Sequence, residues 1–127
     1  MKSVSLLACS AALLFACGKA AINFDEIFSG DGTYYGENNG DGNCALNEPI
    51  HPQYAGLTAV AMNGKQYKGS CGACVEVIEG GEGSGADPIK PFKGYVADQC
   101  GGCAHGDLDL ATAGDGRWKI KWKFIKW

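Results

Sequence analysis

The 127-residue sequence has none of the short motifs that mark the common nucleotide-dependent and metal-dependent enzymes. A Gly-rich phosphate-binding loop and a His-Glu-x-x-His pair are both missing, and the two histidines form no evident Ser-His-Asp set. Apolar repeats of period 3.6 are also scarce, which argues against a helical bundle. We therefore expect neither a cofactor nor a bound metal ion.

Long apolar runs are limited to the first residues, so nothing further along can cross a membrane as a helix. Residues 1–21 combine Lys2, an apolar run over 4–17 and small residues at its end, which predicts a secretory signal peptide. A buried N-terminal helix and lipid attachment at Cys17 are the alternatives. Residues 22–127 would then form one domain in the extracellular space or the cell wall.

Positive charge is in short supply, and the formal net charge is −3. Removal of Lys2 and Lys19 with the signal would make it −5. This balance argues against nucleic acid as a partner. We expect a monomer that does not contact the membrane once the signal is removed.

Glycine is abundant, with 20 residues, and the chain contains many short β-prone segments. We expect strands near 33–35, 57–62, 74–78, 92–97 and 117–127. Residues 22–30 are interpreted as a loose lead-in, 79–87 as a flexible tip, and 108–113 as one or two helical turns. Asn63-Gly64 is a strong turn signal. About six short strands with little helix predict an all-β, closed barrel.

The last eleven residues alternate between large apolar and basic side chains. The apolar set, which is expected to face the core, comprises Trp118, Ile120, Trp122 and Phe124. Lys119, Lys121 and Lys123 form the opposite face. They either solubilise the strand or meet an anionic wall polymer.

Five cysteines remain beyond the signal, and four of them form two Cys-x-x-Cys pairs. The spacing of Cys71, Cys74, Cys100 and Cys103 suits a zinc site, and either pair alone could be redox-active. Secretion favours disulfides instead. The preferred first bridge joins Cys44 to Cys71, with Cys74 bonded to Cys100 or Cys103, but the sequence does not fix this connectivity.

Residues 96–110 (VADQCGGCAHGDLDL) concentrate the polar groups most suited to chemistry. Asp98 and Asp109 bracket a Gly-rich and Cys-rich loop that can fold back and bring both carboxylates together. Paired carboxylates are typical of proteins that act on polysaccharides. Asp107 is better suited to a structural cap, and His105 is expected to face solvent.

Four segments, in this order, resemble the first domain of the expansins: 32–36 (GTYYG), 71–77 (CGACVEV), the 96–110 block and 119–122 (KIKW). The resemblance covers about residues 30–126. It implies a six-stranded double-psi β-barrel with a shallow groove. Family 45 endoglucanases, lytic transglycosylases of the rare-lipoprotein-A type and barwin-like proteins share this fold.

The resemblance also implies a site. Asp109 matches the key acidic residue of expansins and the general acid of the family 45 hydrolases, while Asp98 and Thr33 match residues that line the same groove. Tyr35 lies one pleat repeat from Thr33 and should share its face. Glu37 falls near the position of the hydrolase base and is a possible base here.

The implied function is non-hydrolytic loosening of cell-wall polysaccharide, either cellulose, xyloglucan or a related glucan, with peptidoglycan possible. Expansins usually carry a second, cellulose-binding domain, and without it this chain looks like a loosenin. Gln99-Cys100 stands where some expansins have an aromatic residue. The alternatives are a glycanase or peptidoglycan lytic transglycosylase with Asp109 as acid, and a barwin-like carbohydrate-binding or protease-inhibitor module.

Overall fold

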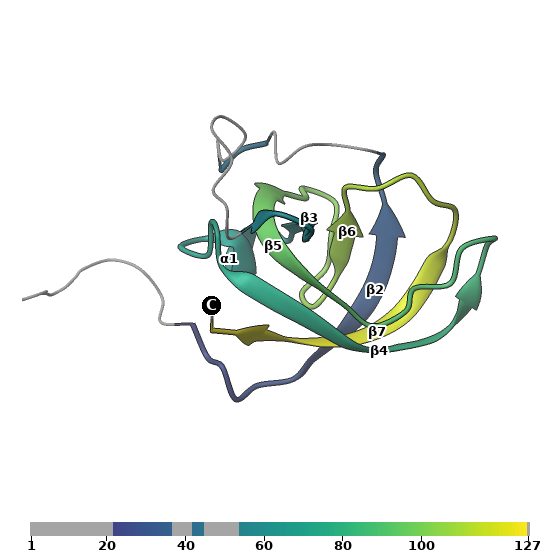
Figure 1. Ribbon diagram of the computed structural model, residues 1–127, viewed down its shortest axis with the longest axis horizontal. Helices are drawn as coiled ribbons and strands as arrows, with labels where there is room; N and C mark the ends of the chain where they lie inside the picture. The colour runs from purple at the N-terminus through teal and green to yellow at the C-terminus, as the bar shows by residue number, and fades with distance from the viewer. Residues whose placement is uncertain (1–21, 37–41, 45–53, 127) are drawn as a thin grey trace, which may run out of the picture.

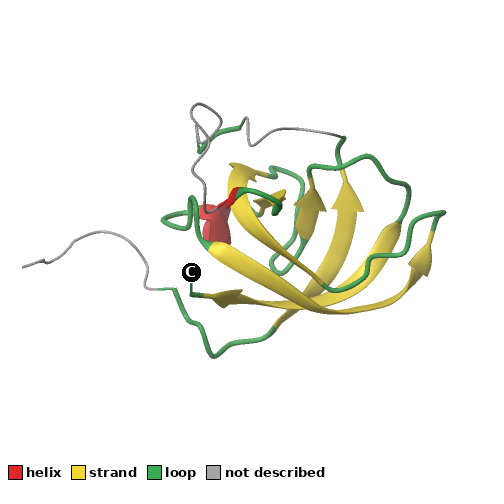
Figure 2. Ribbon diagram, viewed as in Figure 1, coloured by secondary structure: helices red, strands yellow, loops and turns green. Residues whose placement is uncertain are grey.

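The computed structural model describes residues 22–36, 42–44 and 54–126. These form one short helix and six strands, which close into a barrel in the order β2-β6-β3-β5-β4-β7 (Figures 1 and 2). The elements are β2 Phe28–Tyr34, β3 Thr58–Met62, α1 Gly64–Tyr67, β4 Cys74–Ser84, β5 Phe92–Gln99, β6 Leu108–Leu110 and β7 Arg117–Ile125. The predicted all-β, six-stranded double-psi β-barrel is confirmed. No helix in the described part of the chain is long and apolar enough to span a membrane.

Two strand pairs are parallel, β2 with β6 and β3 with β5, and the other neighbours are antiparallel. The parallel pair β3 and β5 is joined by a long path through α1 and β4, and β6 then inserts between β2 and β3. This crossing brings the short strand β6, from late in the chain, beside β2, from its beginning (Figure 1).

The barrel core is built by alternation along the strands, most regularly in β7. Its apolar side chains are buried and its lysines point outward, as predicted from the sequence. Trp122 is fully buried at 0% exposure, and its indole Nε1 donates to the Gly106 carbonyl over 2.8 Å. Burying that polar atom is therefore compensated, and the bond ties β7 to the loop before β6.

The outer face of β7 is not an isolated basic surface. Asp31, on the neighbouring strand β2, accepts hydrogen bonds from Lys119 over 2.9 Å and from Arg117 over 2.8 Å. These bonds, led by the one from Lys119, lower the pKa of Asp31. Lys121 lies 3.8 Å from Glu79. Two carboxylates thus contact three of the four basic residues on this face of β7, which favours a solubilising role for the lysines.

Several predicted boundaries are wrong. Strand β2 begins at Phe28, inside the expected lead-in, because Phe28 packs into the core against Trp122. The expected helical turn at 108–113 is instead strand β6, because Leu108 and Leu110 both face the core with Asp109 between them. That is the period of a strand.

Two glycine-containing segments also differ from prediction. The expected flexible tip is largely the end of β4, which pairs with β7 as far as Ser84. A Cβ at Gly80 would lie 1.9 Å from the Ile89 carbonyl oxygen, so glycine permits this close backbone contact. Asn63 caps α1 rather than forming a hairpin turn, because its side-chain oxygen accepts from the backbone N–H groups of Lys65 and Gln66.

Two disulfides are present in the described residues. Cys44 bonds to Cys71, the pairing favoured from the sequence, and Cys100 bonds to Cys103. The expected bridge from Cys74 is wrong, because Cys74 is a free, buried thiol. Cys74 pairs across the sheet with Tyr95, five positions before Cys100. At about 3.4 Å per residue, Cys100 lies far beyond the roughly 7 Å reach of a disulfide.

We predict that the double substitution Cys44→Ser/Cys71→Ser destabilises the domain substantially. This bridge spans 27 positions, and opening such a loop costs about 3–4 kcal/mol of unfolding free energy in the chain-entropy description. The expected fall in Tm is roughly 15 °C, measurable by calorimetry. Cys100→Ser/Cys103→Ser, which opens a loop spanning only 3 positions, is the comparison and should cost about half as much. Equal losses from both pairs would contradict this ranking.

Candidate functional site

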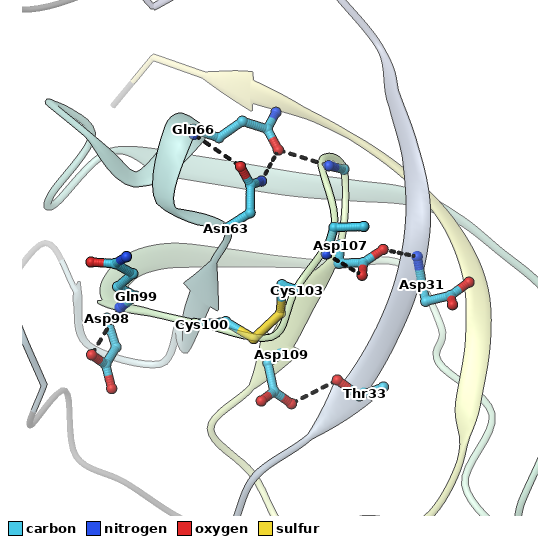
Figure 3. The surroundings of a disulfide bond; sticks show 12 residues. Asp31, Thr33, Asn63, Gln66, Asp98, Gln99, Cys100, Cys103, Asp107 and Asp109 are labelled. Atoms are coloured by element: carbon cyan, nitrogen blue, oxygen red, sulfur yellow. Dashed lines mark hydrogen bonds between the residues drawn. A yellow bond between two sulfur atoms is a disulfide. The ribbon is translucent and has the colours of Figure 1, made fainter.

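Four adjacent strands place the predicted polar residues in a single row. In register, Thr33 on β2 lies beside Asp109 on β6, Asp109 beside Ala61 on β3, and Ala61 beside Asp98 on β5. Figure 3 shows Thr33, Asp109 and Asp98 with their side chains on the same side of the sheet. We call these four residues the Asp109 row. Its two aspartates are separated by two strand spacings, or about 9–10 Å between backbones.

Asp109 is presented outward by its own neighbours. Leu108 and Leu110 are buried in the core, so the residue between them must point to the outer face of the barrel. The Thr33 hydroxyl donates a 2.7 Å hydrogen bond to Asp109 Oδ1. One carboxylate oxygen is therefore fixed by the neighbouring strand, and Asp109 remains only partly buried.

A β-bulge brings Asp98 into the row. The register between β3 and β5 shifts after Val60, so that Asp98 pairs with Ala61 and Ala97 has no partner in the register. A bulge re-aims the side chains that follow it. Without it, strict alternation from the buried residue Val96 would direct Asp98 into the core.

Asp98 also holds the loop that precedes β3. Its Oδ1 accepts hydrogen bonds from the backbone N–H of Gln99 over 2.8 Å and of Asn43 over 3.0 Å. The next residue, Cys44, donates from its backbone N–H to the Ala97 carbonyl over 3.0 Å. The structure therefore gives Asp98 a positioning contact at one edge of the row, beside the Cys44–Cys71 disulfide.

Tyr35 lies close enough to both aspartates to be affected by their charges. It follows β2 directly, its backbone N–H donates to the Leu110 carbonyl over 2.9 Å, and its side chain is 36% exposed. Burial, followed by the negative charges of Asp98 and Asp109, raises the pKa of Tyr35 from 10.0 to about 12. The structure thus brings together four predicted site residues: Thr33, Tyr35, Asp98 and Asp109.

The pH titration of Tyr35 provides a direct check of this arrangement. We predict that ultraviolet difference spectroscopy finds its phenolate forming near pH 12, and that Asp98→Asn/Asp109→Asn lowers its pKa. Because the folded pKa lies above the unfolded one, Tyr35 contributes stability that is complete below about pH 10 and is lost as the pH rises through about 12. Tyr35→Phe identifies the band, and an unchanged pKa in the double variant would contradict the placement.

An apolar cluster that the sequence did not reveal lies next to the row on the outer face. Tyr54 and Tyr95 stack with ring centroids 4.4 Å apart, and both are buried. Ala59, Ala97 and Ala111 complete the cluster. The available signal was the alternation of alanine with larger residues along β3, which leaves room for aromatic rings on one face. The cluster gives the row a rigid flank.

Asp107 has the structural role that was predicted for it. Its Oδ1 accepts from the Asp31 N–H and its Oδ2 from the Ala104 N–H, each over 2.9 Å. These bonds fix the loop before β6 to β2, away from the Asp109 row. His105 is exposed, as expected, with its ring 5.7 Å from that of Phe28.

The remaining predicted residue, Glu37, lies outside the described residues. Within 22–36, 42–44 and 54–126 there is no group of three or more His, Cys, Asp or Glu side chains placed to hold a metal ion. The row and the adjacent Tyr35 therefore offer two carboxylates, a hydroxyl and a phenol. Such groups can accept and donate hydrogen bonds to sugar hydroxyls, and a carboxyl can donate to a glycosidic oxygen.

The fold is an expansin-like double-psi β-barrel, as comparison with solved structures shows. No protein-family model and no curated protein matches the sequence. Among solved structures, the chain is similar to the expansin of Clavibacter michiganensis, with 27% identity and a TM-score of 0.54 over 80% of this chain and 51% of that one. This chain thus spans about half the length of that expansin.

Two further solved structures are similar. One is a mutant of the same expansin crystallised in complex with cellohexaose, with 26% identity and a TM-score of 0.54, covering 80% of this chain and 51% of that one. The other is a Streptomyces papain inhibitor, with 24% identity and a TM-score of 0.53, covering 84% of this chain and 100% of that one. The inhibitor supports the barrel fold alone.

Proposed function

We propose that this protein is a secreted, loosenin-type expansin-like protein that binds and loosens cell-wall polysaccharide without cutting it. The observation that carries the proposal is the outward carboxylate of Asp109, bonded to Thr33 and set beside Tyr35 on one face of the barrel. The polymer we propose is a β-glucan such as cellulose or xyloglucan. Secretion is proposed from the signal peptide predicted over 1–21, and the disulfides of the domain support it.

The comparisons support this choice of substrate. The similar expansin was crystallised with cellohexaose, a linear glucan. The present chain matches about half of that expansin. Glucan binding and wall loosening by the present chain are therefore part of the proposal. A row of partly exposed polar side chains on adjacent strands suits a long polymer better than a small ligand, because contacts are spread along a face rather than enclosed.

The proposed mechanism is competition for hydrogen bonds. Glucan chains in a wall adhere through their hydroxyls, and the carboxylate of Asp109 is a stronger acceptor than a neighbouring sugar hydroxyl. The exposed ring of Tyr35 offers an apolar surface beside it. Binding of one glucan chain to the protein would separate that glucan from its neighbours in the wall. When the protein releases the glucan, every covalent bond of the polymer is still intact.

Cleavage is the second candidate, and one observation favours it. The backbones of the two aspartates are about two strand spacings apart, which allows their carboxyl groups to lie at the roughly 6.5–9.5 Å that separates the acid and base of an inverting glycosidase. In that case Asp109 would be the acid. The hydrogen bonds that Asp98 Oδ1 accepts from two backbone N–H groups weigh against Asp98 as base, because they commit that oxygen.

One experiment separates the two candidates. Calorimetric titration with cellohexaose, xyloglucan oligosaccharides and peptidoglycan fragments measures binding, while released reducing ends and mass spectrometry of soluble products measure cleavage. Weakening of cellulose paper measures loosening. Binding and weakening without product support the proposal. Products that vanish in Asp109→Asn would establish an enzyme instead, and absence of both binding and product would refute a polysaccharide function.

A further inference from the structure

The loop from β5 to β6 contains a disulfide that closes a very short turn in open space. Cys100 and Cys103 enclose only Gly101 and Gly102, both exposed. A Cβ added at either glycine would meet no atom within 4 Å, so open space surrounds the turn. Thiol–disulfide exchange requires a thiolate to approach the disulfide, and this turn offers an unobstructed path. Figure 3 shows the bridge in the loop that links the strands of Asp98 and Asp109.

The loop does not depend on this bridge for its position. On one side, the Cys100 N–H donates to the Met62 carbonyl over 2.8 Å. On the other, Asp107 accepts from the backbone N–H groups of Ala104 and Asp31, each over 2.9 Å. Both ends of the loop are thus held by hydrogen bonds to the barrel or within the loop. Opening the bridge would free the glycine turn and little else.

The second disulfide has a different role. Cys44 and Cys71 are 27 positions apart, and their bond ties residues 42–44 to the start of β4. Cys71 is exposed, so accessibility alone does not distinguish the two bridges. What distinguishes them is the effect of opening. Loss of the Cys44–Cys71 bond releases a long loop, whereas loss of the Cys100–Cys103 bond releases two glycines.

We propose that Cys100–Cys103 is a thiol–disulfide exchange site that accepts electrons from an external dithiol while the barrel stays folded. A thiolate of the dithiol attacks one cysteine sulfur, the Cys100–Cys103 bond breaks, and the departing cysteine takes the electron pair and then a proton. The second thiolate of the dithiol then attacks the mixed disulfide. The products are the oxidised, cyclic dithiol and two cysteine thiols, so two electrons and two protons reach the protein.

The same loop also favours the reverse step, in which the two cysteine thiols are oxidised back to the disulfide. The Cys103 N–H donates to the Cys100 carbonyl over 3.2 Å, which closes a turn independently of the sulfur atoms. This turn keeps the two thiols close after reduction, and an oxidised dithiol can restore the bond. Residues outside the turn need not move in either direction.

The test uses the full secreted chain with dithiothreitol as the probe. Samples taken over time under native conditions are alkylated, and peptide mapping assigns each labelled cysteine. We expect Cys100 and Cys103 to be labelled with no loss of the folded circular dichroism spectrum and little fall in Tm, whereas labelling of Cys44 and Cys71 should accompany a large fall in Tm. Transfer to oxidised dithiothreitol should restore the Cys100–Cys103 bond. Unfolding that accompanies the opening of Cys100–Cys103, or a bond that fails to re-form, would overturn the proposal.

Two variants guard against a misleading result. Cys44→Ser/Cys71→Ser retains only the proposed exchange site, and its reduction should still be reversible. Cys74→Ser removes the free, buried thiol and excludes rearrangement through it. If reversible reduction disappears in Cys74→Ser, the exchange depends on that thiol and the assignment to Cys100–Cys103 alone is wrong.

Discussion

Asp109→Asn is expected to abolish wall loosening and to weaken cellohexaose binding by about 10- to 150-fold. A hydrogen bond to a charged group contributes about 1.5–3 kcal/mol, and asparagine removes the charge. Its side-chain oxygen can still accept from the Thr33 hydroxyl, which Asp109 now does over 2.7 Å. The fold should therefore persist. Calorimetric titration gives the affinity, and thermal unfolding gives the stability.

The matched control is Asp25→Asn, an exposed aspartate in the segment before β2. It makes the same change of charge far from the row and should leave affinity and Tm unchanged. Thr33→Val adds a graded test, because it removes only the hydroxyl that orients Asp109 and should weaken binding less. A folded Asp109→Asn variant with wild-type affinity and full loosening would refute the site assignment.

Gly30→Ala is expected to have the largest effect on stability of the single substitutions considered. An alanine Cβ at this position would lie 2.2 Å from the Gly106 carbonyl oxygen, which is backbone and cannot rotate away. Separating β2 from the loop at Gly106 would also strain the hydrogen bond from Trp122 to that oxygen. Overpacking typically costs 1–3 kcal/mol, and a backbone clash belongs at or above the upper end, so we expect a loss of about 3 kcal/mol.

Gly81→Ala provides the control, since its Cβ would make ordinary contacts no closer than 3.5 Å to Lys119. Both changes replace a strand glycine by alanine, so propensity is matched and only the clash differs. We expect a fall in Tm of more than about 10 °C for Gly30→Ala and little change for Gly81→Ala. Similar Tm values for the two variants would show that β2 and the loop do not touch as described.

The sequence predicted the parts of the fold that follow from local alternation. Residues 117–124 alternate without interruption, and β7 has the expected buried and exposed faces. The short strand β6 was missed because three residues of alternation, Leu108 to Leu110, are as consistent with a helical turn. Its strand geometry comes from partners on both sides, β2 and β3, which are distant in the chain.

The residues of the proposed site could be chosen from the sequence, but their geometry could not. Thr33, Asp98 and Asp109 came from the resemblance to expansins and Tyr35 from the strand period, and the structure brings these four together, while Glu37 lies outside the described residues. The bulge that orients Asp98 depends on the register between β5 and β3. This register cannot be predicted from the spacing of residues along the sequence. The free state of Cys74 follows likewise from its pairing with Tyr95, a long-range contact. Neither the local sequence pattern nor the resemblance to a family predicts such long-range contacts.

The closed barrel restricts how any partner can bind. Each described strand has hydrogen-bonded neighbours on both sides, although several strands are paired on both sides along only part of their length. The barrel therefore has no edge strand that is free along its whole length. A long extended partner is expected to lie across the sheet, where recognition depends mainly on side chains that can change without disturbing the ladder. One barrel can accordingly serve both an expansin and a protease inhibitor, as the two kinds of similar structure illustrate.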